Sequence, residues 1–292
     1  MNAENYTARI TRQTPSAFLF MLDLSGSMEE KVSLNGETLT KAAAVSRLIN
    51  GTIAELVSRC KREDGYREYL DIAVLGYGGD RVWSLLPEGA SHPVFRKPDE
   101  LAYAPVPLVK TFRERVLPDG NKMMVTTETK AWVEPHALGK TPMFGAFTQA
   151  YKLLYEWTRS HAAERCFPPV VINITDGEAT DAEDHELQGI AEKLRELSTG
   201  DGNVLLMNIY IGKEAEYRTV LFPASEKELP ESPYARLLFG MSSPMPEIYR
   251  EEIAAIRGTD NTEGCRGMSY NASMTDLVGM LNIGSISVNL LT

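Results

Sequence analysis

Cysteine is scarce in this chain, which has three such residues, Cys60, Cys166 and Cys265, among its 292 positions. An odd number of cysteines spaced about a hundred residues apart argues against a disulfide framework and a zinc knuckle, and it favours a reducing compartment. The N-terminal stretch 1–15 is polar and lacks the charged and then apolar layout of a signal peptide. We therefore expect a cytoplasmic protein.

Long apolar runs and an excess of basic charge are also lacking. No apolar stretch approaches the roughly 20 residues needed to cross a bilayer, so we expect no membrane partner. The 40 acidic residues outnumber the 30 basic ones and give a net charge of −10, whereas a nucleic-acid-binding face needs clustered Lys and Arg. The chain is long enough to bury a substantial core, and its length fits one large domain or two small ones. We expect residues 1–292 to form one domain.

Apolar runs and helical periodicities alternate along the sequence. Continuous apolar runs at 18–22 and 170–175 predict strands buried on both faces, and helical spacing predicts helices at 39–60 and 143–159. The alternation favours an α/β fold with a doubly wound, mostly parallel central sheet and helices on both faces. Further expected elements are strands at 69–77, 81–86 and 204–211, helices at 184–197, 233–240 and 246–256, an edge strand at 267–271, and a final helix at 275–281 capped by Thr275.

Carboxylate and hydroxyl side chains occur at three separated points beside these elements. Asp23, Ser25 and Ser27 directly follow the first strand, Asp176 closes the strand at 170–175, and Thr141 precedes the helix at 143–159. Because ligands bind at the carboxyl ends of parallel strands, we expect these side chains to lie at one edge of the sheet. Two carboxylates and three hydroxyls, without Cys or His, form a hard-oxygen set that suits Mg²⁺ or Mn²⁺.

This set resembles the metal-ion-dependent adhesion site (MIDAS) of von Willebrand factor A (VWA) domains. That family has an Asp-x-Ser-x-Ser segment, a Thr in a Thr-Pro loop and an Asp-Gly pair at a strand end. The matching residues, in the same order, are Asp23, Ser25, Ser27, Thr141 and Asp176. The resemblance covers most of the chain, from about Pro15 to the C-terminus, and implies the VWA fold.

The resemblance also implies a role for each residue. Ser25 and Ser27 would bind the metal directly, and Thr141 would join them when a ligand is present. Asp23 and Asp176 would hold coordinated waters or bind directly, depending on the conformational state. A carboxylate from a protein partner would complete the octahedron. In some VWA domains ligand capture is coupled to movement of the last helix, here at 275–281, so we expect a two-state element there.

The segment 86–139 departs from the strand and helix alternation. It contains seven prolines and no clean helical pattern, but two extended runs, 110–116 and 122–133, flank a turn at 118–121. Structureless loops of this length are uncommon in compact domains. We therefore predict a β-rich hairpin insertion that lies near the metal face.

A short stretch after the last predicted ligand suggests a biological setting. Residues 176–181, Asp-Gly-Glu-Ala-Thr-Asp, are similar to a segment of stand-alone bacterial TerY-like VWA proteins, which occur in stress-response and conflict systems. The resemblance implies an adaptor or regulator without enzymatic activity. Its partner would be a kinase, a phosphatase or an AAA+ ATPase of the same system.

Simpler interpretations of each segment stay open at this point. Taken alone, Asp-x-Ser-x-Ser could cap a helix, Thr-Asp-Gly could form an ordinary turn, and Thr-Pro could begin a helix. Lys140 either contacts an acidic ligand or points into solvent. An acidic cluster after Asp176 forms either a solvated helix start or a recognition rim; its residues are Glu178, Asp181, Glu183, Asp184 and Glu186.

Two other functions remain possible from the sequence. A metal-dependent phosphoryl hydrolase would use the metal to polarise a phosphate or activate water, although the sequence offers no evident general base beyond the metal-holding acids. A metal-independent scaffold would assemble through the insertion or the final helix.

Overall fold

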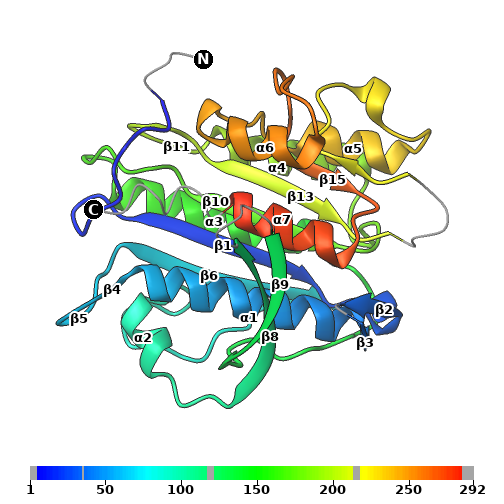
Figure 1. The fold of residues 1–292 in the computed structure, drawn as a ribbon. Coiled ribbons are helices and arrows are strands. Elements are labelled where there is room, and N and C mark those ends of the chain that lie inside the picture. Colours follow the sequence, from blue (N-terminus) through cyan, green and yellow to red (C-terminus); the bar gives the residue numbers. More distant parts are fainter. Residues whose placement is uncertain (1–4, 35, 117–121, 213–217, 285–292) are drawn as a thin grey trace.

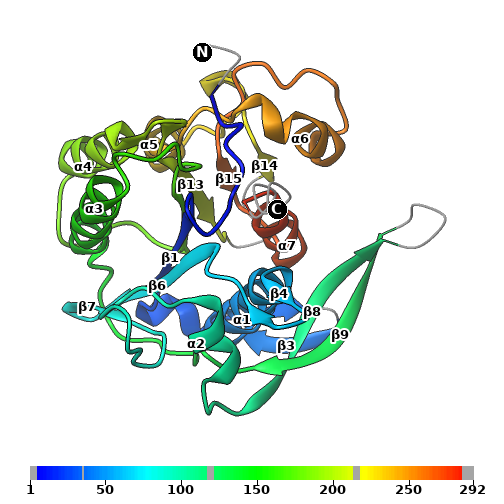
Figure 2. The same cartoon turned by 90° about the vertical axis from the view of Figure 1, so that its left-hand side faces the viewer.

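A seven-stranded mixed sheet forms the centre of the protein. The computed structural model describes residues 5–34, 36–116, 122–212 and 218–284. In the order of the sheet (Figure 1; β14 and β7 are labelled in Figure 2), the strands are β14 (Val220–Leu221), β15 (Met268–Tyr270), β13 (Leu205–Tyr210), β10 (Val170–Thr175), β1 (Ser16–Asp23), β6 (Leu70–Gly78) and β7 (Arg81–Ser84). The inner pairs are parallel, and the outermost pair on each side is antiparallel. The predicted α/β architecture is confirmed.

Helices cover both faces of this sheet (Figure 2). One face carries α1 (Lys41–Arg59), α6 (Arg250–Arg257) and α7 (Met274–Gly284), and the other carries α3 (Met143–Ser160), α4 (Asp184–Glu196) and α5 (Pro233–Met241). Strand β1 is buried along its whole length, with alternate side chains in the two cores. Phe18 and Phe20 pack under α1, while Leu19 and Met21 pack under α3. This two-sided burial explains why the strand reads as a continuous apolar run.

Short elements complete the fold. They are the strands β2 (Lys31–Leu34), β3 (Glu37–Thr40), β4 (Lys61–Arg62), β5 (Gly65–Tyr66), β11 (Ser198–Thr199) and β12 (Gly202–Asn203), and the 3-10 helices Gly26–Glu29, Glu226–Glu228 and Glu247–Tyr249. The hairpin of β2 and β3 was not predicted. It fills the space between the loop after β1 and α1, so α1 begins at Lys41, where Thr40 Oγ1 accepts the amide hydrogen of Ala43.

Two predictions for the end of the chain are wrong. The strand β15 is not at the edge of the sheet, because β14 pairs with its outer side. A two-residue strand such as β14 leaves no periodic signal. Thr275 lies inside α7, and the capping contacts come from Ser273, whose hydroxyl accepts the amide hydrogen of Asp276 at 3.2 Å. The Asp276 carboxylate accepts the Ser273 amide hydrogen in return at 2.9 Å, so the two residues satisfy each other's backbone groups.

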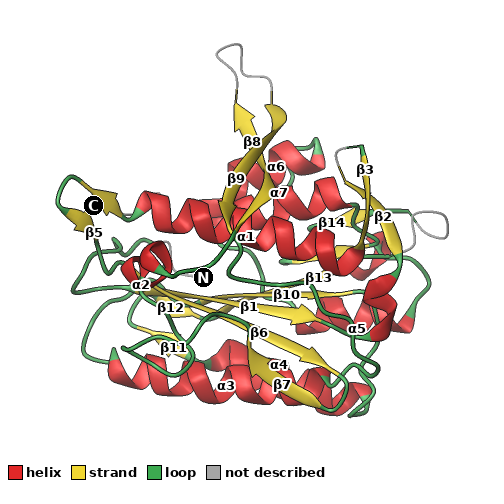
Figure 3. Ribbon diagram, turned by 90° about the horizontal axis from the view of Figure 1, so that it is seen from below, coloured by secondary structure: helices red, strands yellow, loops and turns green. Residues whose placement is uncertain are grey.

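The segment 86–139 contains a helix and a hairpin. Helix α2 (Pro98–Tyr103) is followed by β8 (Leu108–Val116) and β9 (Lys122–Lys130), which pair antiparallel; the predicted turn at 118–121 lies outside the described residues. The hairpin lies across α1 and projects from the domain (Figure 3). Asn50 of α1 fixes the chain after β9, since its side chain exchanges hydrogen bonds of 2.8 and 2.9 Å with the Val133 backbone.

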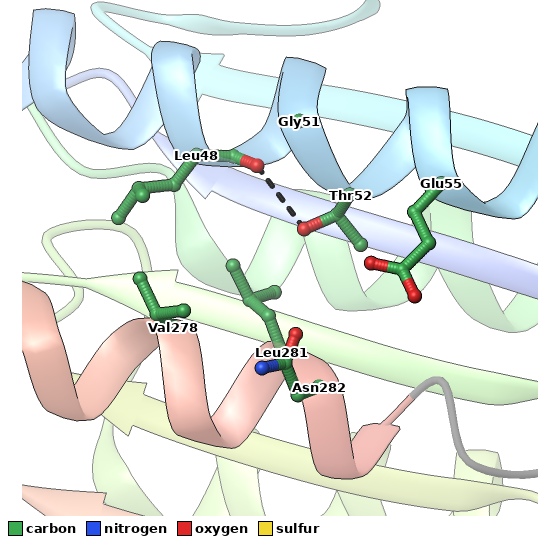
Figure 4. A pocket seen from close by; sticks show the side chains of 7 residues that line it. All are labelled: Leu48, Gly51, Thr52, Glu55, Val278, Leu281 and Asn282. Carbon is green, nitrogen blue, oxygen red and sulfur yellow. Dashed lines mark hydrogen bonds between the residues drawn. The ribbon is translucent and has the colours of Figure 1, made fainter. Parts of the chain in front are cut away.

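Helix α7 lies beside α1 on the same face of the sheet. A recess of about 20 Å³ separates them (Figure 4), lined by Leu48, Gly51, Thr52, Glu55, Val278, Leu281 and Asn282. The lining combines the apolar Leu48, Val278 and Leu281 with the polar Thr52, Glu55 and Asn282. Within the described residues, none of the helices combines the length and the apolar character that spanning a bilayer requires.

A chain of polar side chains runs through the core between the sheet and α5. Tyr77 Oη donates to Asn173 Oδ1 at 2.8 Å, and Asn173 Nδ2 donates to Asn208 Oδ1 at 3.1 Å. Asn208 Nδ2 donates to Ser242 Oγ at 3.0 Å, and that hydroxyl donates to the Leu238 carbonyl at 2.7 Å. All four side chains are buried. Each of these side chains is a hydrogen-bond partner of the next one. The hydrogen-bonded row therefore stabilises the core only while it is complete.

We predict that Asn173→Ala lowers the free energy of unfolding by about 2–4 kcal/mol. The substitution removes the donor to the buried Asn208 Oδ1 and leaves the Tyr77 hydroxyl with only the Ile174 carbonyl, 3.5 Å away. Each unsatisfied buried group costs about 1–3 kcal/mol. Urea denaturation followed by circular dichroism measures the change, with the exposed Asn261→Ala as the matched control. A loss no larger than that of the control would contradict the prediction.

Candidate metal site

The carboxylate of Asp23 joins the carboxyl ends of β1 and β10. Its Oδ1 accepts the amide hydrogen of Ser25 at 2.8 Å, and its Oδ2 accepts the hydroxyl hydrogen of Thr175 at 2.6 Å. Burial raises the pKa of Asp23 from 3.8 to about 6, although the hydrogen bonds from Thr175 and Ser25 act in the opposite direction. The carboxylate thus shapes the turn after β1 and holds it against the neighbouring strand.

Three further predicted ligands form a continuous set of oxygen atoms. The hydroxyls of Ser25 and Ser27 lie 3.1 Å apart, and Ser27 Oγ donates to Asp176 Oδ1 at 2.6 Å. Ser25 and Asp176 are buried, whereas Ser27 is exposed. The structure therefore brings the first and third segments together, and the set reaches solvent at Ser27.

Thr141 approaches the same point from the start of α3. A Cβ atom built on Gly177 would lie 3.8 Å from Thr141 Oγ1 and 4.0 Å from Ser27 Oγ, so both hydroxyls border the same glycine. The Thr141 amide donates to Thr180 Oγ1 at 3.0 Å, and the Thr180 amide donates to the Thr141 carbonyl at 3.0 Å. Thr180, to which the sequence assigned no role, therefore binds the Thr141 loop to the loop that follows Asp176.

Glycines allow the first two loops to touch. The Gly26 amide donates to the Gly139 carbonyl at 2.9 Å, and Gly139 has a φ of 54°, a conformation that favours glycine. A Cβ at Gly78 would lie 2.5 Å from the Leu24 carbonyl oxygen. Together with the hydrogen bonds of Asp23, Ser27 and Thr180, the contact between the first two loops joins all three segments at one edge of the sheet, as predicted from the sequence.

The charged residues around these loops have structural partners. Lys140 lies on the surface, with its Nζ 3.4 Å from Asp80 Oδ1. Asp181 accepts the amide hydrogens of Phe144 and Gly145 at 3.0 and 2.9 Å, where an acid complements the start of α3. Glu186 accepts the Glu183 amide hydrogen at the start of α4. These carboxylates begin helices, which favours the structural interpretation of the acidic cluster.

Lys41 is the main residue of this region that the sequence analysis missed. Its Nζ donates to Asp176 Oδ2 at 2.8 Å and to Glu30 Oε2 at 2.9 Å, although Lys41 is only 3% exposed. Burial by itself lowers the pKa of Lys41, but the hydrogen bonds and charges of Asp176 and Glu30 offset this effect and raise the pKa. The side chain therefore carries a positive charge. A cation in the first turn of a helix opposes the helix dipole, and this was the available signal that Lys41 has an acidic partner.

The composition of the site determines which ions it suits. In the part of the chain that the structure describes, no three His, Cys, Asp or Glu side chains gather into a potential metal site. A metal would therefore depend on the hydroxyls of Ser25, Ser27 and Thr141 in addition to the two carboxylates. Such an all-oxygen set fits a hard cation such as Mg²⁺ or Mn²⁺ and disfavours a soft one.

Comparisons with known proteins yield similar structures but no sequence relative. No protein-family model matches the sequence, and no curated protein matches it. A von Willebrand factor type A protein from Catenulispora acidiphila is similar with a TM-score of 0.42 and 14% identity, over 78% of this chain and 37% of that one. An uncharacterized membrane-spanning protein from Vibrio fischeri is similar with a TM-score of 0.27 and 16% identity, over 84% and 88% of the two chains. This chain thus spans little more than a third of the length of the first protein.

We predict that Asp23→Asn stabilises the metal-free protein at pH 7.5 by about 1–3 kcal/mol. An acid whose pKa is raised by folding binds its proton more tightly in the folded state, so the wild type loses stability as the pH rises from about 4 to 6. The variant lacks that loss, and its advantage should shrink as the pH is lowered below 6. Urea denaturation in EDTA at pH 7.5 and pH 5 measures both effects. A variant that is less stable than the wild type at pH 7.5 would contradict the argument.

Proposed function

We propose that the protein is a metal-dependent binding module in which Mg²⁺ or Mn²⁺ links Asp23, Ser25, Ser27, Thr141 and Asp176 to a carboxylate of a protein partner. The main support is the contact between loops 149 residues apart in the sequence, where Ser27 Oγ lies 2.6 Å from Asp176 Oδ1. This contact brings together two of the three segments on which the resemblance to the metal-ion-dependent adhesion site rests.

The chemistry of the ligands supports an anionic partner. Neutral hydroxyls leave a divalent cation less neutralised than a cage of carboxylates would, so the ion retains affinity for another anionic oxygen. Ser27 is exposed while Asp23 and Asp176 are buried. A carboxylate of the partner would approach from the side of Ser27.

We further propose a regulatory rather than a catalytic role. Asp23 and Asp176 are engaged by hydrogen bonds that shape the loops, and no separate general base lies among the five residues. The protein would act as an adaptor or regulator in a bacterial stress-response or defence assembly, as a TerY-like protein. Its partner would be a kinase, phosphatase or AAA+ ATPase of the same system, and the expected location stays the cytoplasm.

Calorimetric titration of the metal-stripped protein tests the metal site. We expect saturable binding of Mg²⁺ and Mn²⁺, with Ser27→Ala weakening it by about tenfold or more, because ligand and near-ligand substitutions have effects of this size. The matched control is Ser33→Ala on the exposed side of β2, which should bind like the wild type. Equal binding by Ser27→Ala would exclude this residue as a ligand.

Partner capture tests the function that the metal serves. When the immobilised protein is incubated with an extract of the native host in Mg²⁺, the partner that it captures should be released by EDTA. Immobilised Ser27→Ala should not capture this partner. Partner capture that is unchanged by EDTA and by Ser27→Ala would favour the metal-independent scaffold. Turnover of a phosphate ester that disappears in Asp23→Ala would instead favour the hydrolase.

Helix α7 is the proposed two-state element of this binding module. It packs beside α1, whose first residue, Lys41, contacts Asp176, and a recess separates the two helices (Figure 4). We expect the amide hydrogen exchange of α7 to change when Mg²⁺ and acetate are added together. Mass spectrometry of peptides covering 274–284 measures the exchange, with peptides covering β10 as the internal control. Unchanged exchange in α7 would argue against the coupling.

A further inference from the structure

The ammonium of Lys41 contacts Asp176, one of the two carboxylates in the proposed metal site. One oxygen of Asp176 accepts from Ser27 at 2.6 Å, and the other accepts from Lys41 Nζ at 2.8 Å. The Asp176 side chain has no exposed surface, and that of Lys41 is 4% exposed. Because water has little access to the pair, the charge of Lys41 is screened weakly and acts on any cation bound at the neighbouring oxygen.

The formal charges show the consequence for a divalent ion. Asp23 and Asp176 supply two negative charges, and Lys41 removes one of them. A cation at the hydroxyls would therefore meet a net charge of about −1 instead of −2 from these three groups. The Glu30 carboxylate also lies 2.9 Å from Lys41 Nζ, but its side chain is 40% exposed, so water screens its charge and it offsets Lys41 only in part. A carboxylate from a ligand restores the missing charge, so the ligand and the cation each increase the affinity of the site for the other.

We propose that Lys41 is a built-in counter-cation that holds the Mg²⁺ affinity of the site low until an anionic ligand binds. This inference rests on the metal-dependent function proposed above and adds a mechanism for it. The site would bind metal and ligand together and would discriminate against either one alone.

Glu30 provides an alternative partner for the ammonium. It accepts from Lys41 Nζ at 2.9 Å, its side chain is 40% exposed, and its carbonyl accepts the Lys41 amide hydrogen at 2.8 Å. Glu30 directly follows the 3-10 helix that carries Ser27. The ammonium can therefore be held by Glu30 when Asp176 engages a metal, without any change in the backbone contact between Lys41 and Glu30.

Titration calorimetry with Mg²⁺ alone tests the role of Lys41. We expect Lys41→Met to bind Mg²⁺ about tenfold more tightly than the wild type, since even in a water-like dielectric a unit charge a few ångström from a divalent ion has an effect of that order. The matched control, Lys31→Met, removes the same charge from an exposed neighbouring position and should change the affinity less than twofold. In the wild type 50 mM acetate should tighten Mg²⁺ binding, and in Lys41→Met this gain should be smaller.

The outcomes separate this inference from the proposed function. If the wild type binds Mg²⁺ and Lys41→Met binds it equally or more weakly, the counter-cation role is wrong and the metal-dependent function stands. If Lys41→Met binds Mg²⁺ and the wild type does not, Lys41 blocks the metal completely. This result would support the counter-cation role and overturn the proposed metal-dependent function of the wild type. If neither binds, both proposals fall.

A second pair of variants decides the matter if Lys41→Met does not fold. Glu30→Gln leaves the ammonium to Asp176 alone and should weaken Mg²⁺ binding severalfold more than Glu29→Gln, which neutralises an exposed neighbouring acid. Equal effects of the two variants would overturn the proposal. Circular dichroism and thermal melting establish that each variant is folded.

Discussion

The hydrogen bond between Thr175 and the buried Asp23 carboxylate ties the ends of the two central strands together. Its length is 2.6 Å, and it spans β1 and β10 at the edge where the loops leave the sheet. The other oxygen of the same carboxylate fixes the turn that carries Ser25. Asp23 therefore positions the first loop against the third. The second loop joins them through Thr180 and Gly139, so the candidate site takes its shape from the Asp23 hydrogen bonds together with these contacts.

The electrostatics of the site reflect a conflict between folding and binding. Burial without a counter-ion destabilises the ionised form of Asp23 and raises its pKa. The second carboxylate, Asp176, instead has a lysine at 2.8 Å. Among the described residues, no basic side chain forms an ion pair with Asp23, whereas Asp176 is paired with Lys41. The buried Asp23 carboxylate thus lowers the stability of the fold at neutral pH, a cost that functional sites often carry.

Much of the fold followed from simple periodicity. The apolar runs predicted β1 and β10 because both are buried on two sides, and their carboxyl ends placed Asp23, Ser25, Ser27 and Asp176 at one edge of the sheet. Lys41 was not foreseen, because a lysine at the start of an amphipathic helix reads as a surface residue. Its partner Asp176 lies 135 residues away in the sequence, and a local sequence pattern cannot indicate a contact between residues so far apart. The position of the β8 and β9 hairpin across α1 likewise depends on Asn50 and Val133, which meet only in the folded chain.

The polar chain through the core also determines how β10 and β13 align. Asn173 lies opposite Asn208 in that pair, whereas the other facing residues are mostly interchangeable aliphatic side chains. Because both faces of these strands are buried, the alternation of polar and apolar residues cannot choose between alignments. A slip by one residue would set each asparagine against an aliphatic residue of the other strand and leave the two amides on opposite faces of the sheet. The two asparagines therefore act as a register mark, which selects one alignment among several that would bury similar apolar surface.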